Sequence, residues 1–172
     1  MISKTMQKAF NEQINAELYS EYLYLAMSSY CDTIDLPGFA NWMLQQSTEE
    51  RIHAMRFYNF VHDRDGEVEL LAIDKPPVKY KNVLDMFENV LKHEQLVTKR
   101  IHDLYALAQK ENDYAAQVEL QWFISEQVEE EKTAKDIIQQ LKWVGDKSTA
   151  LFMLDQKLDQ RAAPAAAAPA DE

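Results

Sequence analysis

The sequence has few residues that break helices or cross-link a chain. Its 172 residues include only 3 Gly, 5 Pro and a single cysteine, Cys31. One cysteine excludes a disulfide framework within the chain and a cysteine-rich metal site. Because Gly and Pro are the strongest local breakers of regular structure, their scarcity leaves room for long uninterrupted helices.

Positive charge is also scarce. The chain carries 18 Lys and Arg against 29 Asp and Glu, a formal net charge of −11. Nucleic-acid binding requires a basic surface, so we expect no nucleic-acid partner; an acidic surface instead attracts cations. The sequence contains no apolar run long enough for a membrane span or a secretory signal. These features predict a cytoplasmic protein without a membrane partner.

What the sequence does contain is a series of long amphipathic segments. Ser3 suits the cap of the first helix and Pro37 suits the first turn of the second. Segment 67–81 includes Pro76-Pro77 and lacks helical periodicity, which predicts a long extended connection. The expected helices span approximately residues 3–31, 37–64, 82–110, 114–144 and 148–158.

This order predicts the fold class. Two helical hairpins joined by one long connection form an all-α four-helix bundle with one long crossover, to which a short fifth helix is added. We expect a single domain over residues 1–160. Residues 161–172 are rich in Ala and Pro, which predicts a disordered tail.

Each long helix has a polar residue near the middle of the stripe that should face the core. Alternate steps of four and three residues define these stripes. They are Phe10, Ile14, Glu17, Glu21 and Tyr24; Phe39, Met43, Gln46, Glu50, His53, Phe57 and Phe60; Leu84, Phe87, Leu91, Glu94, Thr98, Ile101 and Tyr105; and Ala116, Leu120, Phe123, Gln127, Glu130, Ala134, Ile137 and Leu141. A buried carboxylate is unfavourable unless it is paired or binds a metal.

The depth of these polar residues along the helices agrees between the hairpins. Glu17 and Glu50 each lie 14 residues from the first turn, roughly 21 Å at the helical rise of about 1.5 Å per residue. In the second hairpin, Glu94, Gln127 and Glu130 lie 14 to 17 residues from the turn at 111–113. If the hairpins pack centre to centre, all of these side chains converge in one layer.

The residue types in this layer favour a particular chemistry. Carboxylates with one imidazole suit a cation such as iron or manganese. Glu50 and His53 are three residues apart and share a helical face, and the central position of Glu50 suits a carboxylate that bridges two metals. Two irons held close together can each give an electron to dioxygen, the usual use of carboxylate di-iron bundles.

Four segments resemble those of the bacterial non-haem ferritins, and the likeness extends from about residue 6 to residue 158. They are NEQINAELY at 11–19, EERIH at 49–53, KHEQL at 92–96 and SEQVEEE at 125–131. The resemblance implies a ferritin-like fold and a ferroxidase that oxidises Fe²⁺ with dioxygen or peroxide. It also implies a homo-oligomeric shell of 24 subunits that stores ferric mineral.

The resemblance also implies roles for individual residues. The first iron is held by Glu17, Glu50 and His53, and the second by Glu94 and Glu130, with Glu50 as the bridge. Gln127 matches a residue that places oxygen or water beside the metals, and Tyr24 matches a tyrosine that is a candidate electron donor. A third iron position is implied at Glu49, Glu126 and Glu129, with Glu130 shared.

Two positions depart from related families. Bacterioferritins bind haem through a Met immediately after the bridging Glu, whereas this chain has Arg51 there, so we expect no haem. Animal ferritins line a three-fold channel with an Asp and a Glu, and the corresponding residues here are Gln117 and Leu120. An acidic three-fold entry route for iron is therefore not expected.

Other interpretations of the same residues remain open at this point. The central layer could be a buried salt-bridge network, and Glu49, Glu126 and Glu129 could form a solvated acidic face. Alternative functions are a rubrerythrin-like peroxidase or other di-iron oxidase, and a bundle that only binds divalent metal. The remaining histidines fall off the stripes and are expected at the surface: His62, His93 and His102.

Overall fold

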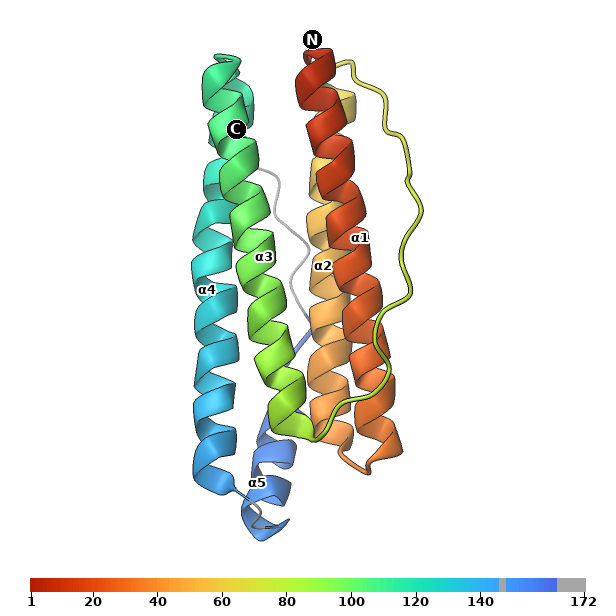
Figure 1. Ribbon diagram of the computed structural model, residues 1–172, viewed down its shortest axis with the longest axis vertical. Helices are drawn as coiled ribbons and strands as arrows, with labels where there is room; N and C mark the ends of the chain where they lie inside the picture. Colours follow the sequence, from red (N-terminus) through yellow and green to blue (C-terminus); the bar gives the residue numbers. More distant parts are fainter. Residues whose placement is uncertain (146–147, 164–172) are drawn as a thin grey trace.

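A computed structural model describes residues 1–145 and 148–163 of the chain. The described residues form five α-helices and no β-strand (Figure 1). The helices are α1 (Lys4–Thr33), α2 (Pro37–Asp63), α3 (Val83–Lys110), α4 (Tyr114–Val144) and α5 (Ser148–Leu158). The predicted all-α bundle with one long crossover and a short fifth helix is confirmed. Most of the predicted tail, residues 164–172, lies outside the described residues.

Side-chain caps explain where three of the helices begin. The oxygen of Ser3 accepts the backbone N–H of Met6, and the side chain of Asn82 accepts that of Asp85, at 3.2 and 2.8 Å. The carboxylate of Asp113 caps α4 in the same way. These caps satisfy N–H groups that lack a partner within the helix. Since each cap lies next to the turn it stabilises, the predicted helix starts agree closely with the observed ones.

The long helices pair into two antiparallel hairpins, α1 with α2 and α3 with α4. Between α2 and α3, the crossover runs along the outside of α1 over the length of the bundle (Figure 1). Asn11 donates a hydrogen bond to the carbonyl of Glu67 near its start, and Tyr30 donates one to the carbonyl of Tyr80 near its end. The crossover reverses the chain, so α3 begins at the same end of the bundle as α2.

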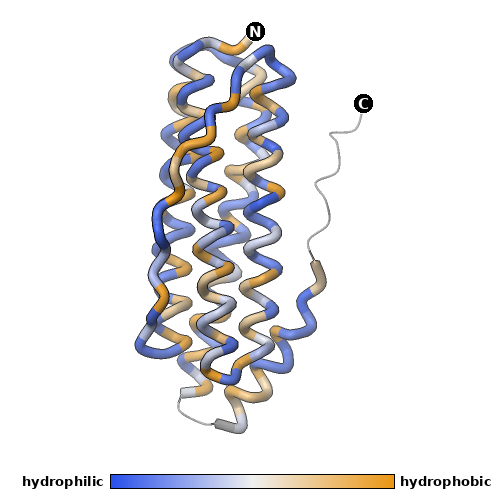
Figure 2. Tube along the Cα trace, turned by 90° about the vertical axis from the view of Figure 1, so that its right-hand side faces the viewer, coloured by the Kyte–Doolittle hydropathy of each residue, from blue (hydrophilic) through white to orange (hydrophobic). Residues whose placement is uncertain are grey.

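The apolar core is divided into two clusters. One cluster includes Met27, Phe39 and Phe87 and lies towards the α1–α2 turn. The other contains Phe57 and Phe123, whose rings stack with centroids 3.8 Å apart. Along the helices at the front of Figure 2, hydrophobic residues recur between hydrophilic ones. The layer between the clusters holds the polar residues that interrupt the predicted stripes.

The inward face of α3 differs from the prediction. Its buried residues include Val90, Val97 and Leu104, whereas Leu84, Leu91, Thr98 and Tyr105 are only half-buried. The predicted and observed faces share Phe87, Glu94 and Ile101. Apolar residues next to the predicted stripe widen the apolar face of α3. Helical spacing alone therefore could not decide between the predicted stripe and the observed one, which is displaced by one residue.

Glu21 is also misplaced in the predicted stripe of α1. Its side chain is half-buried and lies 3.5 Å from the guanidinium of Arg51 on α2. Glu17 and Tyr24, four residues before and three after, are buried as expected. Glu21 therefore belongs to the contact between α1 and α2 at the edge of the hairpin and not to the central layer.

Helix α5 is anchored to the beginning of α2 and also packs on α4. The buried carboxylate of Asp155 accepts the backbone N–H of Phe39 at 2.9 Å. A Cβ atom on Gly38 would lie 1.8 Å from the carbonyl oxygen of Asp155, so this close approach requires glycine. In the described part of the chain, no helix is long and apolar enough to cross a membrane.

Candidate metal centre

The central layer collects polar side chains from all four long helices. Each is at most 8% exposed although it carries a carboxylate, an imidazole or an amide: Glu17, Glu50, His53, Glu94, Gln127 and Glu130. Apolar clusters lie on both sides of them. The structure thus brings together the residues that the resemblance implies for two irons.

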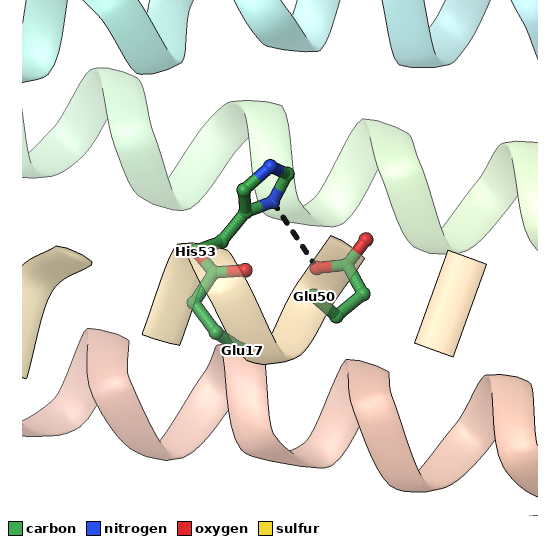
Figure 3. A group of neighbouring side chains, drawn as sticks. All are labelled: Glu17, Glu50 and His53. Atoms are coloured by element: carbon green, nitrogen blue, oxygen red, sulfur yellow. Dashed lines mark ion pairs between the residues drawn. The ribbon is translucent and has the colours of Figure 1, made fainter. Parts of the chain in front are cut away.

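In the half of this layer formed by α1 and α2, the candidate ligand atoms lie close together. Glu17, Glu50 and His53 each offer a ligand atom, and these atoms lie within 4.8 Å of one another. In Figure 3, Glu17 projects from α1 towards the other two side chains, which both project from α2. Nδ1 of His53 lies 3.6 Å from Glu50, and Gln13 donates a 2.7 Å hydrogen bond to Glu17.

In the half formed by α3 and α4, neutral donors hold the carboxylates. Glu94 accepts hydrogen bonds from the Tyr24 hydroxyl and, at 3.1 Å, from the amide of Gln127. Glu130 accepts one at 2.9 Å from the amide of Gln46, which also lies 3.4 Å from Glu50. Gln46 therefore connects the carboxylates of the two halves.

Burial dominates the electrostatics of the layer. It raises the pKa of Glu17, with a further contribution from nearby Glu50, and it raises the pKa of Glu50 and of Glu130, with a further contribution from Glu94. The pKa of Glu94 is likewise raised by burial. Loss of hydration disfavours each carboxylate anion, and the neighbouring carboxylates repel one another.

The charge balance of the layer fits divalent cations. Within residues 1–145 and 148–163, no Lys or Arg pairs with any of these four carboxylates, and His53 is the one basic group in ion-pair contact, with Glu50. A buried salt-bridge network needs a cation for each buried anion. Two divalent metals would supply four positive charges for four carboxylates, with oxygen and nitrogen ligands that suit iron.

A second group of ligands lies beside the first. Glu49, His53 and Glu126 each offer a ligand atom, again within 4.8 Å of one another. Burial raises the pKa of Glu126. Glu129, which the resemblance also implies here, is exposed and outside the group. His53 therefore lies between two possible metal positions, a placement that sequence spacing did not reveal.

Arg161 was missed because it begins the segment that composition predicts to be disordered. Its guanidinium lies 2.5 Å from Glu49 and donates a 2.8 Å hydrogen bond to Gln46. Gln46 was placed on the inward stripe of α2, but without a role. No local sequence signal connects Arg161 to the metal centre, since 112 residues separate it from Glu49.

His93 was expected at the surface, but its side chain is half-buried. Its Nε2 lies 2.7 Å from the hydroxyl of Ser20, and its ring is 5.9 Å from that of Tyr19. Burial lowers the pKa of His93 to about 4. The side chain fills the contact between α1 and α3, which sequence spacing did not place.

These features define a class of protein. A four-helix bundle with one long crossover, whose centre holds Glu side chains from four helices and one Glu-x-x-His pair, is a carboxylate di-iron bundle. Residues 7–144 match the ferritin-like domain family. The chain belongs to the ferritin family.

Individual relatives agree with this assignment. The chain is 38% identical to the bacterial non-heme ferritin of Staphylococcus aureus strain USA300 over 94% of this chain and 97% of the relative. It is 39% identical, with the same coverage, to that of Staphylococcus haemolyticus. Iron storage and ferroxidase activity are the functions of this family, whose members bind iron and form homo-oligomers.

Solved structures show the same fold at higher identity. The open pore ferritin of the archaeon Archaeoglobus fulgidus is 49% identical and superposes with a TM-score of 0.93 over 94% of this chain and 99% of the other. A closed form of that ferritin, engineered by mutagenesis, is 48% identical with a TM-score of 0.94, over 95% of this chain and 100% of the other.

Proposed function

We propose that this chain oxidises Fe²⁺ at the buried layer of four glutamates and one histidine, and that a shell of 24 subunits stores the product as ferric mineral. The observation that carries the proposal is the set of buried carboxylates from four helices without Lys or Arg partners among the described residues. Such a set requires cations.

The two halves of the layer suggest how two irons are held. Glu17, Glu50 and His53 hold the first, because their ligand atoms are already gathered. Glu94 and Glu130 hold the second. Glu50 bridges the two, and its proximity to the Gln46 amide that bonds Glu130 supports this role.

The oxidation balances with dioxygen or peroxide as the acceptor. Two Fe²⁺ ions lose one electron each, and dioxygen takes up these two electrons and two protons to give hydrogen peroxide. With peroxide as the acceptor, two electrons and two protons give two water molecules. Gln127 is positioned by its bond to Glu94 to orient oxygen or water. Tyr24, whose hydroxyl donates a hydrogen bond to Glu94, is the proposed source of a further electron. Together with one electron from an Fe²⁺ at the proposed third position and two protons, it would reduce the hydrogen peroxide to two water molecules.

The second ligand group is the proposed third iron position. Glu49, His53 and Glu126 lie within 4.8 Å of one another, and Glu126 is half-buried. Because His53 faces both groups, this position adjoins the first iron. Glu129 and Glu130 complete it according to the family resemblance.

Two other functions are less well supported. A rubrerythrin-like peroxidase would place a second Glu-x-x-His pair in the second hairpin, where this chain has Gln127 and Glu130. A bundle that only binds metal would not oxidise it. The proposed location is the cytoplasm, which the likeness to bacterial non-heme ferritins supports.

Adding Fe²⁺ under air tests the proposal, with Glu50→Ala as the variant and Glu88→Ala as a control. Glu88 is a carboxylate of α3 whose partner is Lys142 near the end of α4. We expect the wild type to oxidise many Fe²⁺ ions per subunit and to keep the ferric product in solution. The fast phase should be slower by about 100-fold in Glu50→Ala, since second-sphere losses alone cost up to about 100-fold.

The result that would overturn the assignment of the bridge is a wild-type rate in Glu50→Ala. The shell requires a separate measurement. A particle no larger than a dimer in solution would contradict storage inside a shell of 24 subunits. Fe²⁺ that binds but is not oxidised under air would favour the metal-binding bundle.

A further inference from the structure

From Asp155 in α5 onward, the chain runs along α2 towards the metal centre. Three successive contacts mark this path. Asp155 binds the backbone of Phe39, the carbonyl of Asp159 accepts a 2.9 Å hydrogen bond from Asn41, and Arg161 reaches Gln46. Because Asp155 is buried and Gly38 allows close approach, the position of Arg161 follows from a packed anchor.

The guanidinium of Arg161 has three kinds of partner. Nη2 lies 2.5 Å from a carboxylate oxygen of Glu49, and Nη1 donates to the side-chain oxygen of Gln46 at 2.8 Å. The guanidinium carbon also lies 4.6 Å from the centre of the Trp42 ring. The side chains of Arg161 and Glu49 are only 24% and 20% exposed. A charge-assisted pair in such surroundings is stronger than one in open solvent.

This pair occupies a ligand of the proposed third iron position. Glu49 groups with His53 and Glu126, but its Oε2 atom already binds Arg161. A metal ion and a guanidinium compete for the same carboxylate oxygens, since both are attracted by its negative charge. A metal that binds through Glu49 therefore weakens or breaks the ion pair between Glu49 and Arg161.

We propose that Arg161 is an internal cation that competes with metal for Glu49 and so weakens retention at the third position. The inference rests on the third iron position of the proposed function. An iron that reaches Glu49 displaces Arg161, and the return of Arg161 favours release of that iron. The segment after α5 thereby regulates how long the third position stays filled.

Calorimetric titration of the full-length, metal-free protein with Zn²⁺ alone tests this inference. We expect Arg161→Gln to tighten the weakest class of binding by about five- to tenfold, as for loss of one competing charge-assisted pair. The two tighter classes should be unchanged. Arg161→Lys keeps the charge and should stay closer to the wild type.

Lys157→Gln provides a matched control for charge. Lys157 lies on α5 and binds the side chain of Gln140, not a carboxylate of the metal centre. The same loss of one positive charge should leave the weakest class unchanged. In a Glu49→Gln background, Arg161→Gln should have no further effect, because the oxygen for which the two cations compete has lost its charge.

Each outcome decides the inference. An unchanged or weaker third class in Arg161→Gln overturns it, as does an equal gain in Lys157→Gln. If the wild type binds only two Zn²⁺ ions, a third in Arg161→Gln supports it and its absence overturns it. Failure of the ferroxidase proposal appears separately, as the absence of Fe²⁺ oxidation under air, and leaves the Zn²⁺ titration interpretable.

Discussion

The two hairpins contribute to the metal centre in different ways. In the α1–α2 half, two carboxylates and an imidazole lie with their ligand atoms within 4.8 Å of one another. In the α3–α4 half, Glu94 and Glu130 are instead held by hydrogen bonds from the neutral side chains of Tyr24, Gln127 and Gln46. The ligand atoms of one half lie close together, whereas in the other half neutral donors orient the two carboxylates.

For the two metals of the proposed function, this difference predicts binding in sequence. The gathered half can accept a cation with little rearrangement, and preorganised ligands bind more tightly because less ordering is needed. In the other half, Glu94 and Glu130 belong to no such group among the described residues, so a metal there requires more ordering, and the neutral donors behind the carboxylates favour that ordering. An unequal pair of positions suits the turnover of iron better than the permanent retention of a cofactor.

The largest expected effect comes from removing the imidazole. His53→Ala should weaken the first step of an anaerobic Co²⁺ titration by on the order of 100-fold, since even residues behind the ligands contribute about 10- to 100-fold. The visible spectrum of Co²⁺ reports each step. His102→Ala, an exposed position on α3, serves as the control. If His53→Ala bound the first Co²⁺ with wild-type affinity, the first metal would not bind in the α1–α2 half, and the proposed difference between the two halves would be wrong.

A smaller effect is expected from the second half. Gln127→Leu removes an amide donor from Glu94 while retaining similar volume. The second Co²⁺ step should weaken by about tenfold, and the first should not change. Gln95→Leu on the exposed face of α3 controls for the loss of a polar side chain. Equal weakening of both steps would mean that the halves do not bind metal independently.

The smallest effect should follow from Tyr24→Phe. The phenol donates one hydrogen bond to Glu94, and such a bond contributes about 0.5–1.5 kcal/mol, so the second step should weaken by roughly threefold. Tyr30→Phe, whose hydroxyl donates to the carbonyl of Tyr80, is the control. Freeze-quenched oxidation of the wild type should show a tyrosyl radical that Tyr24→Phe lacks. A radical of equal intensity in the variant would exclude Tyr24 as the electron donor.

Much of the fold was predictable because its signals are local. Ser3, Asn82 and Asp113 satisfy N–H groups within their own first turns. On α2 and α4, short groups of polar residues interrupt apolar stripes, so Glu50 and Glu130 could be placed in the core from spacing alone. Their common depth in the two hairpins then predicted one shared layer.

The errors arose where a choice depended on contact between helices. The two candidate inward faces of α3 consist of apolar residues at adjacent sequence positions. Only the packing of α3 against α1 and α4 decides which of the two faces is buried. His93 lies off the stripe, yet it is covered because Ser20 and Tyr19 of α1 lie over it. Local periodicity carries no information on which neighbouring helix will cover an intermediate face.

The sequence by itself determined a bundle of long helices with a carboxylate-rich layer at its centre, since helical periodicity, capping and the unfavourable burial of charge are properties of short segments. Only the tertiary structure decided that one half of the layer is gathered and the other held by neutral donors. It also decided that Arg161 meets Glu49 across 112 residues of chain. Such contacts depend on how α5 packs against α2, which no single segment encodes.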